Sequence, residues 1–275
     1  MSVTGSKDLL PKRAVWYWGG SPMSFLRYMS LVSFRKYHPD WDMTLVVRSH
    51  GSNPHRWKEQ QDTVYYSGRD YMAEVPGLRV VELEKEYPHL TRCYENQVSD
   101  ILGWAWVSHG GMKCDMDLLW RAPINYELIK GVCVGIWQYL NAFPVGVVLG
   151  NEFGFFDHLR KKAVERIQNN RAEFNYQEVG PNLLRDEFSA LKESYDITVL
   201  PNSWLYPFVD NMVNWKTMCA QPFICGKNRP SLPSDCVAVH WYAGSIVVKE
   251  WNIKSQEEIC AADNLIGDIV RAVLQ

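Results

Sequence analysis

The chain has 275 residues, of which 47% are hydrophobic and 22% are charged, and its formal net charge is −2 at pH 7. This length and composition are typical of a globular α/β protein with a buried core and argue against a disordered chain. The near-neutral charge excludes a general attraction to polyanions, so nucleic-acid binding would require a local basic patch.

Seven cysteines are spread along the chain without a CxxC pair, which indicates neither a zinc site nor a disulfide scaffold. The first residues lack an apolar signal core, and no run approaches the roughly 18 apolar residues of a membrane span. We therefore expect a soluble, cytoplasmic protein without a transmembrane segment.

Strand-like and helix-like segments alternate along the chain. A β-rich run at 13–18 is stopped by Gly19 and Gly20, and helical spacing follows at 24–38. Further strands are predicted at 43–48 and 78–83, both buried, and at 112–114, 131–137, 144–150, 196–201 and 235–241. Further helices are predicted at 95–109, 158–170, 181–193 and 256–274. The alternation predicts a layered α/β fold with a mostly parallel sheet, and ligands beyond the carboxyl ends of its strands.

The stretch HGGMKCDMDLLW, residues 109–120, places Asp115 and Asp117 at the end of a predicted strand. If the chain is still extended there, both carboxylates point to the same side, and without a basic neighbour they repel each other. A divalent cation such as Mg²⁺ would remove the repulsion, and substrate phosphates would complete its ligand shell. The pair therefore predicts a site for a metal and a diphosphate.

The Asp-x-Asp spacing alone is a weak signal. Fifteen aspartates in 275 positions give roughly 0.8 such matches by chance. A second match, Asp40 and Asp42, follows Pro39 at the end of a predicted helix and is interpreted as a turn. The surrounding sequence has to distinguish the two pairs.

That context is a resemblance to a known family. SDILGWAWVSHGGMKCDMD, residues 99–117, resembles the central signature of the DXD-type glycosyltransferases of family 32, which includes yeast mannosyltransferases and bacterial capsule enzymes and is similar to the glucosylating clostridial toxins. In that family a helix opens with Ser-Asp, runs into Gly-Gly and delivers a strand that ends in Asp-x-Asp. Four further fragments resemble the family in the same order: YWGG at 17–20, VGPNLL at 179–184, VLPNSWLYPF at 199–208 and VHWYAGS at 239–245.

The resemblance implies a GT-A type fold, a Rossmann-like nucleotide-binding sheet in a single domain over 1–275. The donor-binding half would span about 13–125, and the acceptor-side half with a C-terminal closing motif about 126–275. The implied activity is metal-dependent transfer of a hexosyl or pentosyl group from a UDP- or GDP-sugar to an acceptor, with retention of anomeric configuration. Mn²⁺ or Mg²⁺ would neutralise the leaving diphosphate.

The resemblance also assigns roles to residues of the donor site. Trp18 would stack on the base; the structural alternative is a tryptophan that packs in the core. Asp100 would hold the ribose; the structural alternative is a carboxylate that interacts favourably with the helix dipole near a helix N-terminus. Asp115 and Asp117 would serve the ribose, the metal and the diphosphate and are the first catalytic candidates. His240 would bind the metal or the diphosphate, or be a satisfied core histidine.

Three more residues have assigned roles. Gly111 and Ser245 are assigned to donor binding because they lie within the motifs that resemble the family. Asn151 is the third catalytic candidate, where it would bond a sugar hydroxyl or merely cap the next helix. Trp241 and Trp251 would line the acceptor side or simply pack in the core.

One position departs from the family pattern. An arginine usually follows the Ser-Asp by three residues and reaches the donor, but this chain has Gly103 there. Another cation, for example Arg92, Lys113 or Arg121, would have to replace it, or donor binding differs.

Two other functions remain open. A phosphohydrolase of the haloacid dehalogenase type also has Asp-x-Asp after a strand, but Leu118 and the position far from the N-terminus argue against it. A non-catalytic sugar-binding relative would fit the missing arginine. The partners implied are a nucleotide-sugar donor and an acceptor, expected to be a glycan or lipopolysaccharide, with a protein or a modified DNA base as alternatives. The only hint of nucleic acid is the basic helix at 158–171, for which a solvated face is the simpler interpretation.

Overall fold

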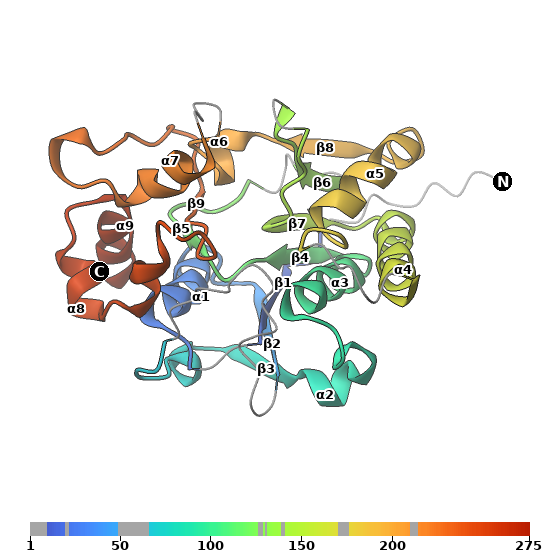
Figure 1. Ribbon diagram of the computed structural model, residues 1–275, viewed down its shortest axis with the longest axis horizontal. Helices are drawn as coiled ribbons and strands as arrows, with labels where there is room; N and C mark the ends of the chain where they lie inside the picture. Colours follow the sequence, from blue (N-terminus) through green and yellow to red (C-terminus); the bar gives the residue numbers. More distant parts are fainter. Residues whose placement is uncertain are drawn as a thin grey trace.

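A computed structural model shows a seven-stranded sheet with helices on both faces (Figure 1). It describes residues 10–19, 22–48, 66–125, 129, 131–138, 141–169, 176–209 and 214–275. The strand order is β3-β2-β1-β4-β7-β6-β8, and the order reverses between β1 and β4. The strands are β1 Arg13–Trp18, β2 Asp42–Val47, β3 Leu78–Glu82, β4 Gly111–Cys114, β6 Val132–Gly135, β7 Val147–Gly150 and β8 Ile197–Leu200.

The sheet is mostly parallel. β7 pairs antiparallel with both β4 and β6, and the other pairs in the sheet are parallel. The α/β fold with a mostly parallel central sheet that the sequence predicts is therefore confirmed. Because β1 and β4 are parallel neighbours at the point where the strand order reverses, their carboxyl ends mark the place where such sheets typically bind ligands.

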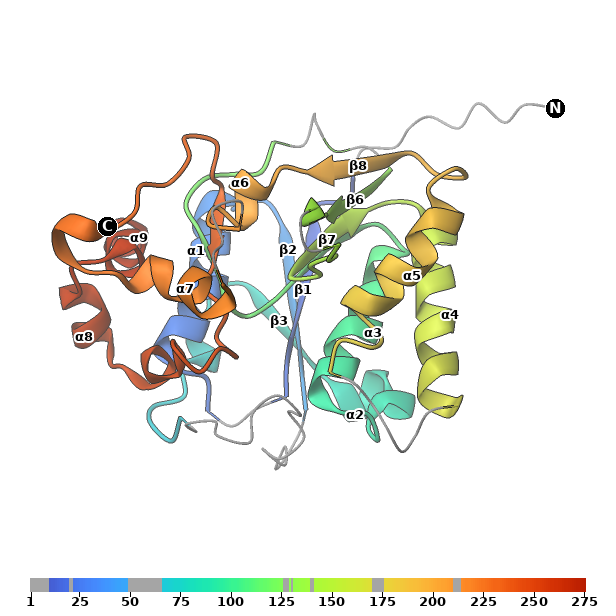
Figure 2. The ribbon, with the colours of Figure 1, turned by 45° about the horizontal axis from the view of Figure 1, so that its top comes forward.

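The two faces of the sheet have separate apolar cores. Along β1, Ala14 and Trp16 point to one core, and Val15 and Tyr17 point to the other, as the alternation of a strand requires. Figure 2 shows one group of helices on each side of the sheet. The first group is α3 Glu95–Val107, α4 Phe153–Asn169 and α5 Pro181–Leu191; the second is α1 Phe25–Tyr37, α7 Trp215–Ala220, α8 Gln256–Ala261 and α9 Leu265–Leu274.

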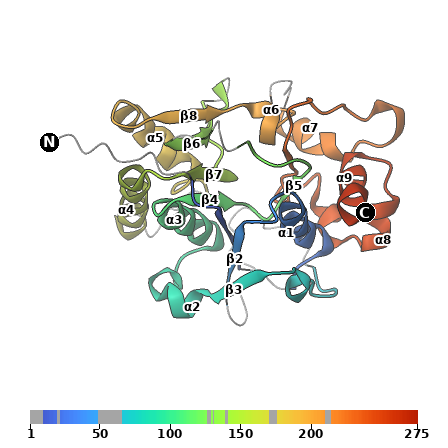
Figure 3. The ribbon, with the colours of Figure 1, turned by 180° about the vertical axis from the view of Figure 1, so that it is seen from behind.

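Short elements complete the chain. A separate two-stranded sheet joins β5 Leu118–Trp120 to β9 Ala238–His240 in antiparallel pairing. Two four-residue helices, α2 Leu83–Glu86 and α6 Asn202–Leu205, lie near the two edges of the main sheet, as the view from behind shows (Figure 3). Within the described residues, no helix is long and apolar enough to cross a bilayer.

The strand predicted at 235–241 is present as β9, in the small sheet. Two expectations from the sequence are wrong. The segment 78–83 forms the edge strand β3, whose residues are half-buried or exposed rather than buried. The predicted helix 256–274 is two helices, since Asn264 leaves the helical conformation and its side chain accepts from the Gly267 N–H to cap α9.

The turn between α3 and β4 requires glycine. Gly110 has φ +82° and Gly111 has φ +124°, which are positive values that L side chains rarely adopt. A Cβ on Gly111 would lie 2.7 Å from the carbonyl oxygen of Arg13. The Gly-Gly pair therefore allows β4 to pair with β1 directly after the turn. The sequence predicts the end of this helix at Gly110.

His38 is a buried histidine that the fold holds neutral. Its Nε2 accepts from the Ile124 N–H at 3.0 Å, and its Nδ1 lies 3.2 Å from the Phe34 carbonyl oxygen, to which it donates. The ring is 1% exposed. Burial lowers the pKa of His38 to about 4, because a charged imidazolium would lose both its hydration and its role as acceptor.

We expect His38 to make the fold less stable in acid. The folded-state pKa lies below the unfolded value, so its contribution is complete above about pH 6.5 and is lost as the pH falls toward 4, by about 3 kcal/mol at most. Chemical denaturation from pH 4 to 7 measures this loss. The difference in unfolding free energy between the wild type and His38→Gln should shrink across that window. A constant difference for His38→Gln across this window would contradict the assignment.

Candidate metal and diphosphate site

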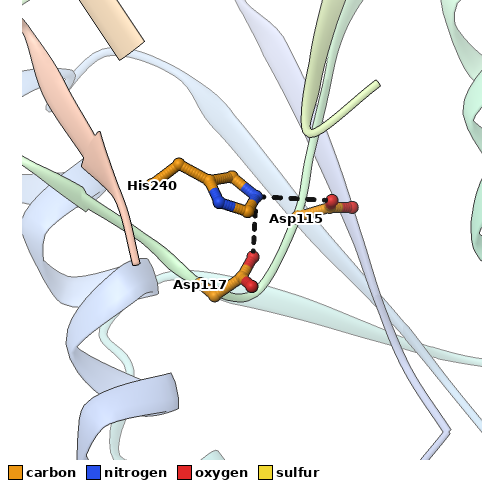
Figure 4. Close-up of side chains that lie close together, drawn as sticks. All are labelled: Asp115, Asp117 and His240. Carbon is orange, nitrogen blue, oxygen red and sulfur yellow. Dashed lines mark ion pairs between the residues drawn. The ribbon is translucent and has the colours of Figure 1, made fainter. Parts of the chain in front are cut away.

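Asp115 and Asp117 lie where β4 ends and turns into β5. The Asp115 N–H donates to the Gly146 carbonyl at 2.7 Å, which fixes the end of the strand beside β7. Met116 and Asp117 form a turn before β5 begins at Leu118. The expectation that strand alternation aligns the carboxylates is therefore wrong. They converge because the turn brings Asp117 back toward Asp115 (Figure 4).

His240 completes a cluster with the two aspartates. It ends β9 and pairs with Leu118, so the small sheet carries it to the Asp-x-Asp turn. Its Nε2 lies 3.3 Å from an oxygen of Asp117 and 3.9 Å from an oxygen of Asp115. One donor atom from each residue lies within 4.8 Å of the others. Two carboxylate oxygens and one imidazole nitrogen at this spacing are a fitting ligand set for Mn²⁺ or Mg²⁺.

The backbone after β9 orients this ligand set. The Ala243 N–H donates to Oδ2 of Asp117 at 2.9 Å, which leaves Oδ1 facing His240. The Tyr242 N–H donates to Nδ1 of His240 at 3.3 Å. In the neutral ring this contact places the proton on Nε2, so a neutral His240 would bind a metal through Nε2 only after the proton moves to Nδ1 and the Tyr242 contact is lost.

Lys113 provides the two aspartates with a basic neighbour, which the strand pattern of the sequence did not predict. Its ammonium is buried, forms an ion pair with Asp115 and donates to the Val145 carbonyl at 2.8 Å. Burial raises the pKa of Asp115, but the charges of Lys113 and His240 outweigh it and leave the pKa below its usual value. The Asp115 carboxylate is thus kept ionised and able to bind a cation.

Lys113 also occupies the space beside Gly103. A Cβ on Gly103 would lie 2.8 Å from Cγ of Lys113, so the lysine stem fills the volume that a larger helix residue would need. Of the three cations considered for the missing arginine, Lys113 alone is placed at the aspartates. Arg121 donates to the Cys236 carbonyl beyond the far end of β5, and Arg92 is exposed in the turn before α3.

Asp100 lies on α3 next to this ion pair. Its carboxylate packs against Gly180, at the start of α5, where a Cβ would be 2.2 Å from Oδ2. Burial raises the pKa of Asp100 to about 7; Lys113 opposes the rise and Asp115 adds to it. Asp100 is close enough to Asp115 and Lys113 to feel the charge of both, which is compatible with the predicted ribose contact; that contact stays a prediction.

Trp18 ends β1 at the same edge of the sheet, half-buried, and Arg27 of α1 lies beside its ring. The Arg27 Cζ atom is 5.5 Å from the Trp18 ring centroid and 5.3 Å from that of Trp241. Sequence reasoning missed Arg27, because one arginine in an amphipathic helix has no distinguishing pattern. Trp241 is fully buried in this contact.

The structure does not bring every predicted site residue to the cluster. Asn151 follows Gly150, which pairs with Gly111 at the start of β4, whereas Asp115 follows the other end of that strand. Asn151 and Gly111 are thus at the opposite end of β4 from the metal cluster, and the backbone demand at Gly111 explains the glycine. Ser245 lies in the turn after β9 with its hydroxyl buried. The functional roles of these three residues stay predictions.

Aromatic rings extend from His240 to the surface. The ring of Tyr242 is 4.3 Å from His240 and 4.9 Å from Trp215, and Trp137 is 6.3 Å from Trp215 (centroid distances). Trp215 is 46% exposed, while Tyr242 and Trp137 are buried behind it. We call Trp137, Trp215 and Tyr242 the aromatic wall. Trp251, in contrast, packs on Phe223 at 4.7 Å.

The basic helix predicted at 158–170 is α4, and its cations are paired with acids. His158 contacts Glu187, and Arg166 contacts both Glu178 and Asp186. The other pairs are Arg160 and Lys161 with Asp157, and Lys162 with Glu165. This ion-paired surface supports the interpretation as a solvated helix face; Arg171 lies outside the described residues.

No protein-family model and no curated protein matches the chain. Among solved structures it is similar to the PaToxG glycosyltransferase (TM-score 0.46, 19% identity, 68% of this chain and 72% of that one). It is also similar to the apo-form glycosyltransferase GlyE of Streptococcus pneumoniae TIGR4 (0.49, 15%, 96% and 61%) and to the galactosyltransferase LgtC in complex with donor and acceptor sugar analogues (0.46, 10%, 96% and 96%). At such low identities and TM-scores the likeness carries no conclusion about function, and the resemblance to family 32 stays a prediction.

The packing of Lys113 against Gly103 predicts an unusual response to alanine. Glycine to alanine inside a helix ordinarily stabilises by about 0.5–1 kcal/mol. In Gly103→Ala the new methyl group would push the Lys113 stem, so we expect a net loss of about 1–2 kcal/mol in unfolding free energy. Chemical denaturation measures it. Gly154→Ala in α4, where the nearest atom is the terminal hydroxyl of Tyr195, is the matched control and should not lose stability to the same degree. A stabilised Gly103→Ala variant would contradict this packing.

Proposed function

We propose that this protein is a metal-dependent glycosyltransferase of the GT-A type that uses a nucleotide diphosphate sugar as donor. The observation that carries the proposal is the Asp115, Asp117 and His240 cluster at the carboxyl edge of a parallel sheet, where the strand order reverses. The resemblance of residues 99–117 to glycosyltransferase family 32 supports the same activity.

Each residue of the site would have a distinct role. Asp115, Asp117 and His240 would hold a divalent metal, which supplies a Lewis acid for the leaving diphosphate. Lys113 keeps the Asp115 carboxylate ionised, and the Ala243 N–H fixes the Asp117 carboxylate so that one oxygen faces the metal position. This arrangement is in place before the donor arrives, so little reorganisation is needed on binding.

The remaining parts of the donor would contact residues of β1 and α3. Trp18 would stack on the base, and Asp100 would accept from a ribose hydroxyl. The expectation of a UDP- or GDP-sugar and of transfer with retention rests on the family resemblance. Mn²⁺ is the first choice of ion, since a mixed oxygen and nitrogen ligand set favours it over Mg²⁺.

We propose a glycan as the acceptor. The aromatic wall supports this choice because flat rings with polar edges suit the apolar faces of sugars, and Trp215 exposes such a ring near His240. The ion-paired surface of α4 offers little to a DNA backbone, which makes a DNA base the less favoured acceptor.

The metal cluster is tested by calorimetric titration of UDP and GDP with and without Mn²⁺. We expect the wild type to bind one of them in a Mn²⁺-dependent manner and the double variant Asp115→Asn/Asp117→Asn to lose at least about 100-fold in affinity, because it removes the anionic oxygens that hold the ion.

The second Asp-x-Asp pair supplies a matched control. The double variant Asp40→Asn/Asp42→Asn changes the same residue types at the same spacing, far from the cluster, and should bind as the wild type does. Nucleotide binding by the wild type that ignores Mn²⁺ would contradict the proposal. So would rapid phosphate release from phosphomonoesters that depends on Asp115, since that is phosphohydrolase chemistry.

The acceptor assignment is tested at Trp215. With a panel of oligosaccharides, Trp215→Ala should raise the acceptor KM by about tenfold, because a stacking ring is lost. Its affinity for the donor nucleotide should stay within about twofold of the wild type. Phe153→Ala removes an equally exposed ring at the start of α4 and should change neither value. An unchanged acceptor KM in Trp215→Ala would reject the aromatic wall as the acceptor subsite.

A further inference from the structure

Arg27 has a position that the proposed roles of the other residues do not explain. It lies on α1 with its guanidinium near the indole rings of Trp18 and Trp241, at the distances given above. Trp18 ends β1, and Trp241 directly follows the metal-site residue His240. The guanidinium is therefore held at the edge of the sheet where the two aspartates lie.

In the part of the chain that the structure describes, Arg27 makes no hydrogen bond with its guanidinium donors. A guanidinium has five N–H donors, yet within the described residues no acceptor lies in hydrogen-bond distance of Arg27, nor any carboxylate in ion-pair distance. The charge is nevertheless partly removed from water: burial lowers the pKa of Arg27, and the charges of Asp117 and Asp115 oppose that shift. Arg27 is half-buried, and none of its nitrogens is among the fully buried atoms that lack a partner, so its donors face water that a phosphate could replace.

We propose that Arg27 binds the diphosphate of the donor nucleotide, a role that rests on the proposed function. The planar guanidinium matches two phosphate oxygens at once, which a lysine cannot do. A metal on Asp115 and Asp117 would bring the diphosphate to the same edge of the sheet. The two indole rings limit the rotation of the guanidinium, so the entropy lost on binding is small.

Titration calorimetry in Mn²⁺ tests the role of Arg27 with three kinds of ligand: inorganic pyrophosphate, the diphosphates UDP and GDP, and the monophosphates UMP and GMP. Arg27→Gln should weaken the binding of pyrophosphate and of the preferred nucleoside diphosphate by about tenfold or more, because one charged hydrogen-bonding partner is lost. The matching monophosphate should change by less than about threefold. The affinity of Arg27→Lys should fall between those of the wild type and Arg27→Gln, and neither variant should bind Mn²⁺ alone more weakly than the wild type does.

Arg13→Gln is the matched control. Arg13 also lies over an indole ring, 4.7 Å from the centroid of Trp106, but at the opposite end of β1. This variant should bind pyrophosphate as the wild type does. Arg27→Gln with wild-type affinity for pyrophosphate would overturn the proposal. A parallel loss of mono- and diphosphate binding together with a lower Tm would also overturn it, because that pattern belongs to a structural residue.

The pyrophosphate titration separates this inference from the proposed function. If the wild type binds Mn²⁺-pyrophosphate in an Arg27-dependent manner but binds no nucleotide, the anion site stands and the glycosyltransferase proposal falls. If nucleoside diphosphates bind in a Mn²⁺-dependent manner and Arg27→Gln does not change their affinity, the proposed function stands and the role of Arg27 is rejected. A wild type that binds neither ligand overturns both.

Discussion

The candidate site depends on the buried ammonium of Lys113. It forms an ion pair with Asp115, donates to the Val145 carbonyl and lies close enough to Asp100 to oppose the rise of its pKa. Removing Asp115 would leave the buried ammonium with less counter-charge; because Asp115 is 32% exposed, the cost should lie below the roughly 3–5 kcal/mol typical of a fully buried pair. The lysine stem fits only because residue 103 has no side chain. The glycine inside α3 therefore allows the ion pair between Lys113 and Asp115.

Much of the fold could be predicted because its signals are local. The strand and helix at 13–38 were recognisable from residue type and spacing, and Gly110 was recognisable as a helix end. The pairing of β5 with β9 was not, since two three-residue strands more than a hundred residues apart leave no periodic pattern. The break at Asn264 was missed because apolar residues on both sides of it continue the helical spacing.

The site was predictable to the extent that its residues fall in one motif. Asp115 and Asp117 were identified from their context, and His240 from a second fragment, but the reason for their convergence was misjudged. Their carboxylates meet because of a turn and the small sheet, and both depend on long-range pairing. The role of Lys113 next to Gly103 is equally a matter of tertiary packing, although the lysine itself had been considered as a replacement cation.

The charges of the site also imply an order of events. Asp115 and Asp117 present anionic oxygens to the same volume that a diphosphate would enter, and like charges in a partly buried site repel each other. Lys113 is already committed to Asp115, and Arg27 alone offers one positive charge against two carboxylates. A divalent ion reverses this balance, because it neutralises the carboxylates and then attracts the phosphates. In the function proposed here, the metal therefore has to be bound before, or together with, the donor.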